Sequence, residues 1–301
     1  MAQHVKLREM AFQMRAADLR QYGQEILDKN PDRSAASEVL DLMAYLVECD
    51  FVGAEAKVAT ISFRFKGTPD EVYVNEATAL ALAHINFAYG RFTELESHAK
   101  SFLQSHRSLP NLEQGEFLDI LRLTAQRAML LDEFAKLSNI YKEMAEYELE
   151  EQSTNLLYLI SSVEAMNLMA RGEFKKASAV AKRNIEIAKQ NNYAGLMAPI
   201  DSMYVVSRSL LAGAKHREAL QAFKEIKETA EKFSQWPWYF FADGYLSREH
   251  ALANELTEAL EIVREEREKL STFNFSHELH FIPDINELSV SHILTDVERM
   301  E

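Results

Sequence analysis

The feature that most constrains the fold of this chain is a short pattern that returns every 40 to 42 residues. In its clearest copy, Gly172 stands two residues before Phe174, and Ala177 stands three residues after it. A glycine can adopt the left-handed conformation that ends a helix. An aromatic residue followed by a small residue, as in Phe174 and Ala177, suits the start of a second helix that packs closely on the first. Equivalent positions, here called the anchors, are Phe51, Phe92, Phe134, Phe174, His216 and Leu256, separated by 41, 42, 40, 42 and 40 residues. This regular spacing predicts a stack of helix-turn-helix repeats.

The position nine residues before each anchor supports the same register. Five of the six copies carry a small residue there: Ala83, Ala125, Ala165, Ser207 and Ser247. The first copy has Leu42 instead. Small residues allow two helices to approach each other closely, so the pattern favours paired helices.

The composition agrees with an all-α chain. Only 9 of the 301 residues are glycine and 6 are proline, whereas 47% are hydrophobic. Few helix breakers and a large apolar fraction favour helices around an extensive core. We predict a single elongated helical-repeat domain over residues 1–301, with an N-terminal capping helix in 1–33, about six repeats in 34–272 and a C-terminal capping segment in 273–301.

The repeats resemble the tetratricopeptide repeat family. The matching residues in the two best copies are Ala165, Gly172, Phe174 and Ala177, and Ala83, Gly90, Phe92 and Leu95. The period exceeds the usual family period of about 34 residues. It is similar to the sensor repeats of MalT-type bacterial transcription regulators, and a HEAT-like array also has this period. The resemblance implies a right-handed superhelix whose first helices line a concave groove.

By this resemblance, the groove positions lie about 8, 12 and 15 residues before each anchor. They include six candidate ligand-binding residues: His84, Arg122, Gln126, Tyr204, Arg208 and Arg248. Arginines on one surface can hold a carboxylate or phosphate group through paired hydrogen bonds. The alternative is that these arginines form ion pairs within the array, with Asp119, Asp201 and Glu164 as partners.

A dense aromatic run is the second candidate interaction site. Its members are Trp236, Trp238, Tyr239, Phe241 and Tyr245. A helix cannot turn so many rings to one face, so some rings must meet another surface. One interpretation is packing between the fifth and sixth repeats. The other is a contact site for a peptide or a second subunit, which makes a homodimer a further expectation.

Charge and cysteine content narrow the function classes. A net charge of −14 disfavours direct nucleic-acid binding and binding to anionic membranes. No apolar run reaches about 18 residues, so the sequence predicts no transmembrane helix. Cys49 is the only cysteine, which fits a cytoplasmic protein. Apart from His250 or Asp284, no third ligand is evident near His277 and His280, so no metal site is expected, and no cofactor motif occurs.

These observations favour a non-catalytic binding module. It would recognise a peptide, a protein segment or an anionic small ligand in the concave groove, as the sensor or regulatory part of a bacterial signalling or transcription-regulatory protein. The alternative is a scaffold or self-association module that uses the aromatic run from Trp236 to Tyr245. An α/α-type enzyme would need two convergent carboxylates in a deep pocket, and the sequence shows no such pair.

Overall fold

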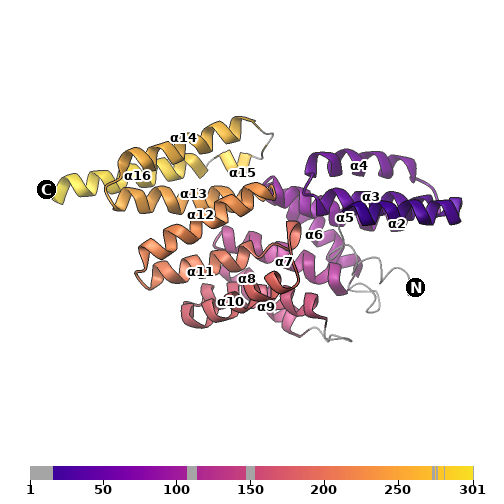
Figure 1. Ribbon diagram of the computed structural model, residues 1–301, viewed down its shortest axis with the longest axis horizontal. Helices are drawn as coiled ribbons and strands as arrows, with labels where there is room; N and C mark the ends of the chain where they lie inside the picture. Colours follow the sequence, from indigo (N-terminus) through magenta and orange to yellow (C-terminus); the bar gives the residue numbers. More distant parts are fainter. Residues whose placement is uncertain are drawn as a thin grey trace.

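The molecule is an all-helical array in which most helices pack mainly on helices that are close to them in sequence (Figure 1). A computed structural model describes residues 16–106, 114–146, 153–272, 275, 277–280 and 282–300. Within them, six helix pairs follow one another. The first helices are α3 (Ser34–Val47), α5 (Glu71–Ala88), α7 (Gln114–Leu130), α9 (Thr154–Ala170), α11 (Ile200–Ala212) and α13 (Trp236–Leu252). The second helices are α4 (Phe51–Arg64), α6 (Phe92–His106), α8 (Phe134–Ala145), α10 (Phe174–Gln190), α12 (His216–Lys232) and α14 (Leu256–Thr272).

Further helices flank the pairs at both ends. At the N-terminal end, α2 (Ala16–Lys29) packs on α3, with the 3-10 helix η1 (Pro31–Arg33) between them. At the C-terminal end, the short α15 (His277–His280) leads into α16 (Ile282–Met300), which packs on α13 and α14. Residues 1–15 of the expected N-terminal cap and part of 273–281 lie outside the described residues. Over the described part of the chain, no helix is both long enough and apolar enough to cross a membrane.

The repeat register predicted from the anchors is confirmed. Each of the six second helices begins at an anchor residue, from Phe51 in α4 to Leu256 in α14. All six positions nine residues before an anchor are buried, including Leu42 in the copy that departs from the small-residue rule. The helix pairs are therefore joined at the same point in every repeat.

The turn inside each pair has a common backbone conformation. The residue two before every anchor has a positive φ, between 56° and 76°: Cys49, Gly90, Asp132, Gly172, Ala214 and Asn254. In the fourth pair, the Glu173 amide donates to the Leu168 carbonyl at 2.9 Å across this turn. This left-handed residue ends the first helix and turns the chain back, and only two of the six copies use glycine for it.

Exchanging alanine and glycine at two of these turns is expected to change stability in opposite directions. Ala214 adopts a φ of 56°, where a side chain is disfavoured by about 1 kcal/mol, so Ala214→Gly should stabilise the fold by about that amount. A Cβ at Gly172 would meet no atom within 4 Å, so Gly172→Ala should cost only the same backbone strain. Urea denaturation of both variants measures the two effects, and shifts of the same sign would contradict this explanation.

The array curves until helices distant in sequence touch. Helices α5 and α13, the first helices of the second and the sixth pair, are in contact. Their Phe87 and Trp238 rings lie 6.4 Å apart between centroids, and Tyr89 lies 6.2 Å from Phe275. One connected hydrophobic core runs from Ala35 in α3 to Leu279 in α15. The inner side of the array is therefore filled by the chain itself.

Two glycines lie where segments that are distant in sequence approach each other closely. Gly90 has a φ of 66°, and a Cβ there would overlap the Leu279 side chain of α15. Gly195 begins the 3-10 helix η2 (Gly195–Met197) with a φ of 58°, and its Cβ would lie 2.8 Å from the Val47 carbonyl oxygen of α3. Both contacts join an early part of the array to a later one, so both positions favour a residue without a side chain.

Candidate functional site

Four of the six side chains predicted to line a groove lie inside the packed array. Their residues are at most 4% exposed: His84, Arg122, Gln126 and Tyr204. The first helices that carry them face a filled interior, because the array curves onto itself. These four side chains therefore do not form an open surface. Their burial does not support the prediction that they contact a ligand.

The carboxylate of Asp201 joins three of the first helices. It accepts hydrogen bonds from Arg122 Nη1 at 3.1 Å and Gln126 Nε2 at 2.7 Å, both on α7, and from Ser162 Oγ on α9 at 2.6 Å. Asp201 itself is fully buried on α11. Arg122 Nη2 also donates to the Leu196 carbonyl of η2 at 2.8 Å. This network holds η2 and α11 against α7, so it stabilises the packing of these helices.

A second buried carboxylate, Asp119, completes the pairing of Arg122. It lies 2.7 Å from His84 Nε2 on α5 and 3.5 Å from Arg122 Nε. Burial opposes the ionisation of Asp119, but His84 and Arg122 together hold the pKa of its carboxyl below the ordinary value. Arg122 therefore forms ion pairs with Asp119 and Asp201 inside the array. This is the alternative to ligand binding that the sequence left open for the arginines.

Arg208, the fifth predicted groove residue, is half-buried against aromatic rings. Its Nη1 donates to the Tyr204 hydroxyl at 2.8 Å, and its guanidinium lies 4.9 Å from the centroid of the Tyr245 ring. Among the described residues, no carboxylate lies within ion-pair distance of it. Arg208 therefore keeps its charge near the surface but makes its contacts to tyrosines of the array.

The aromatic run is mostly internal packing. Trp236, Trp238 and Tyr239 are at most 5% exposed, while Phe241 and Tyr245 are partly buried. Trp236 packs on Phe275, at 5.5 Å between centroids. An exposed patch made by all five residues is therefore not present. The run instead joins the sixth helix pair to α5 and to the segment before α15.

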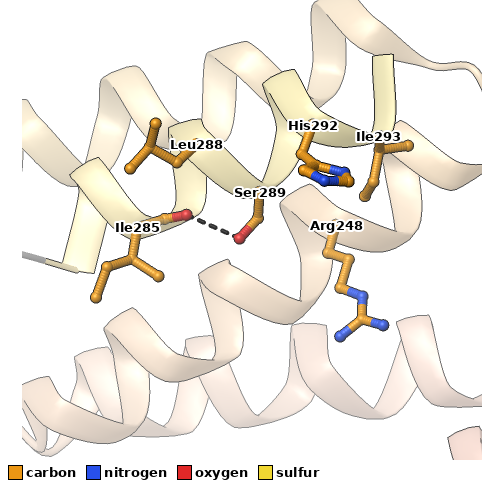
Figure 2. Close-up of a pocket in the computed structure, with 6 residues that line it drawn as sticks. All are labelled: Arg248, Ile285, Leu288, Ser289, His292 and Ile293. Carbon is orange, nitrogen blue, oxygen red and sulfur yellow. Dashed lines mark hydrogen bonds between the residues drawn. The ribbon is translucent and has the colours of Figure 1, made fainter. Parts of the chain in front are cut away.

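The sixth predicted residue, Arg248, lies exposed beside a surface pocket between α13 and α16. The pocket has a volume of about 480 Å³ and is lined by Arg248, Ile285, Leu288, Ser289, His292 and Ile293. All of these residues except Arg248 belong to α16, and Figure 2 shows His292 and Ile293 nearest to Arg248 in this view. We call this the α13–α16 pocket.

The α13–α16 pocket combines a cation with exposed aliphatic side chains. Within the described part of the chain, Arg248 has no carboxylate within ion-pair distance. Ile285 is 58% exposed and Leu288 is 70% exposed. The hydroxyl of Ser289 donates to the Ile285 carbonyl at 2.8 Å, so it is partly satisfied within α16. Such a pocket suits a ligand that carries both an aliphatic group and a carboxylate.

A buried polar cluster holds α16 in place behind the pocket. Asn286 Nδ2 donates to both oxygens of Glu266, at 2.8 and 3.1 Å, and Asn286 also lies against Gly244 of α13. Next to them, Lys227 Nζ on α12 lies 2.8 Å from the fully buried Asp243. Burial raises the pKa of Asp243 to about 7 and that of Glu266 to about 8. In the folded protein both carboxyls therefore keep a proton to a higher pH than in the unfolded chain.

Stability is therefore expected to fall as the pH rises through the neutral range. Near pH 4 and below, Glu266 is protonated in both the folded and unfolded states. As the pH rises, the unfolded chain releases this proton before the folded protein does. The free energy of unfolding therefore decreases, by on the order of a few kcal/mol in all, until the folded protein also releases the proton at about pH 8. Chemical denaturation at several pH values measures the slope. Glu266→Gln should flatten the slope, whereas the exposed control Glu261→Gln should not; equal slopes would contradict the assignment.

Sequence reasoning found Arg248 but missed the five pocket residues of α16. The signal was present in the sequence, because this helix has apolar residues on two faces. Pro283, Asn286 and Val290 form its buried face, whereas Ile285 and Leu288 point elsewhere at helical spacing. A helix that only ends a stack needs a polar outer face, so a second apolar face indicates another contact.

Comparison with known proteins adds no relative. No protein-family model matches the chain, and no curated protein matches its sequence. The resemblance to tetratricopeptide repeats thus stays a prediction, while the all-α array of helix pairs is established by the structure.

Proposed function

We propose that this protein is a non-catalytic helical-repeat module that binds a partner at the α13–α16 pocket. The observation that carries the proposal is the exposed guanidinium of Arg248 beside the exposed side chains of Ile285 and Leu288. Because the inner side of the array is filled, we propose the end of the array, and not the concave groove, as the binding surface.

The chemistry of the pocket favours a peptide or protein segment with a carboxylate next to an aliphatic side chain. Arg248 supplies a planar donor that suits a carboxylate, and Ile285 and Leu288 supply apolar area. A free peptide C-terminus that ends in leucine or isoleucine has both groups, as does an anionic small molecule with an aliphatic tail. We propose the peptide C-terminus, because helical arrays commonly act through extended peptide contacts.

A sensor or regulatory role in a bacterial signalling or transcription protein remains part of the proposal and rests on the family resemblance alone. A cytoplasmic location also remains a proposal, favoured by the single cysteine. The alternative of self-association through the aromatic run has little support, because Trp236 and Trp238 are buried.

The proposal is tested by methyl NMR with N-acetyl-leucine and its amide. We expect N-acetyl-leucine to shift the methyl signals of Ile285, Leu288 and Ile293. Its amide should bind roughly fivefold more weakly, because an exposed charge pair contributes about 1 kcal/mol at most. Arg248→Ala should remove the difference between the two compounds. The control Arg183→Ala, which changes an exposed arginine of α10, should leave the difference unchanged.

Two results would overturn this site. The first is equal binding of the acid and the amide to the wild-type protein. The second is a set of shifted methyl signals that excludes Ile285 and Leu288. A positive result can then be extended by selecting from a library of peptides with free C-termini, which should enrich sequences that end in an aliphatic residue.

A further inference from the structure

The contact face of the last helix, α16, has a polar residue near its centre. Among the described side chains of α16, Pro283, Asn286 and Val290 are buried, and the helix lies along α13 and α14 (Figure 1). Val290 belongs to a small apolar cluster that is separate from the main core. Asn286, between the other two, instead donates to the buried carboxyl of Glu266 on α14. The docking of α16 therefore depends on a group that can change its charge.

Glu266 shares its buried site with a second carboxyl and one cation. Glu266 on α14 and Asp243 on α13 are both fully buried. Lys227 Nζ of α12 lies 2.8 Å from Asp243 Oδ1, whereas Asp243 Oδ2 has no hydrogen-bond partner among the described residues. Burial, together with the charge of Asp243, raises the pKa of Glu266 to about 8. An ionised Glu266 is therefore a second buried negative charge beside a single ammonium group.

The other charged groups near Glu266 do little to compensate this charge. Arg267, its neighbour on α14, is exposed and pairs with Asp284 and Glu287 of α16 at the surface. His280 of α15, which also packs on α14, is exposed. The remaining titratable groups around Lys227 and Asp243 are acidic or phenolic: Glu231, Tyr239 and Glu265. Water would therefore stabilise an ionised Glu266 better than its buried surroundings do.

We propose that α16 is a pH-dependent docking helix, which stays against α13 and α14 while Glu266 is protonated and separates from them more often as Glu266 ionises. In the separated state water replaces Asn286 at both oxygens of Glu266, and the proton of Glu266 passes to the solvent. Five of the six residues that line the α13–α16 pocket belong to α16, so the pocket is lost in this state. The loss of ligand binding that follows rests on the proposed function of the pocket.

The direction of the pH effect follows from the two states of Glu266. In the separated state the hydrated carboxyl has its ordinary pKa of 4.5, whereas in the docked state the pKa is about 8. Docking is therefore strongest below about pH 4.5 and weakens by up to roughly tenfold per pH unit from there to about pH 8. A ligand that fills the pocket binds only the docked state, so it opposes the separation.

Hydrogen exchange of the full chain tests the docking, with protection factors that correct for the intrinsic exchange rate at each pH. The protection of the amides of residues 286–293 in α16 should fall at least roughly tenfold between pH 6 and pH 8. At pH 8 these amides should also be at least roughly tenfold less protected than the most protected amides of α10, because α16 opens without the rest of the array. If residues 286–293 are as protected as those α10 amides at both pH values, α16 opens only with the whole array and the proposal is wrong.

A matched pair of variants tests the role of Glu266. Glu266→Gln keeps a partner for Asn286 but cannot ionise, so residues 286–293 should lose less than roughly threefold in protection over the same pH range. The control Glu261→Gln, at an exposed position of α14, should behave like the wild type. A loss in Glu266→Gln as large as in the wild type would refute the role of Glu266. The wild-type chain also decides the proposal by itself, since protection of residues 286–293 that stays constant from pH 6 to pH 8 overturns it.

N-acetyl-leucine separates this proposal from the proposed function. At ten times its Kd, it should raise the protection of residues 286–293 about tenfold at pH 8, because it binds only the docked state. Binding without this increase would show that the site does not need docked α16, and would overturn the coupling. If N-acetyl-leucine does not bind at pH 6 or pH 8, the proposed function fails, whereas a pH-dependent protection of α16 still establishes the docking.

Discussion

Asp201→Ala is expected to destabilise the protein by about 3 to 5 kcal/mol. The carboxylate of Asp201 is fully buried and accepts hydrogen bonds from Arg122, Gln126 and Ser162. Among the residues that the structure describes, its removal leaves Asp119, at 3.5 Å, as the one carboxylate partner of the buried Arg122 guanidinium. An underpaired buried charge costs more than the hydrogen bonds themselves, because the group has lost its hydration.

Guanidinium denaturation followed by circular dichroism measures this cost. The double variant Asp201→Ala with Arg122→Leu should recover part of the lost stability, because it also removes the charge that was left behind. Asp284→Ala serves as the matched control, since Asp284 is 56% exposed and pairs with Arg267 at the surface. The control should cost less than about 1 kcal/mol. A loss this small for Asp201→Ala would show that the buried network is absent in solution.

Trp238→Ala is expected to destabilise the protein by about 3 to 5 kcal/mol. Trp238 is 1% exposed and packs on Phe87 and Tyr204, with ring centroids 6.4 and 5.2 Å away. Removing the indole opens a large cavity where α5, α11 and α13 meet. The exposed control Phe63→Ala should change stability by less than about 0.5 kcal/mol.

This substitution also separates the two interpretations of the aromatic run. If Trp238 lay on an exposed interaction surface, its replacement would weaken partner binding but leave the unfolding transition in place. The structure places it in the core, so the unfolding temperature itself should fall. An unchanged unfolding temperature in Trp238→Ala would contradict the packing described for α13.

The repeat register was predictable because its signals are local. Each second helix begins at an anchor, and the residue two before that anchor adopts a positive φ. Gly172 and Phe174 alone identify the turn in one copy, and the even spacing transfers it to the others. Non-glycine residues such as Ala214 and Asn254 take the same conformation, which only the spacing could indicate.

The placement of the groove residues was not predictable, because it depends on the curvature of the whole array. A position such as Arg122 faces the inner side of a first helix in any such repeat. Whether that side is open depends on distant contacts, including Gly195 against Val47 and Phe87 against Trp238. No pattern within one repeat encodes contacts between residues more than 140 positions apart. The pocket on α16 was missed because that helix stands outside the repeat.

Closure of the array over its own inner side is the central claim, and a double-mutant cycle on Phe87 and Trp238 tests it most directly. Phe87→Leu and Trp238→Leu, alone and together, should show a coupling energy of about 0.5 to 1.5 kcal/mol in denaturation experiments. A control cycle of Phe87→Leu with Phe223→Leu should be additive within about 0.5 kcal/mol. Additivity in the Phe87–Trp238 cycle as well would mean that the array is open and its inner groove accessible, in contradiction to this account.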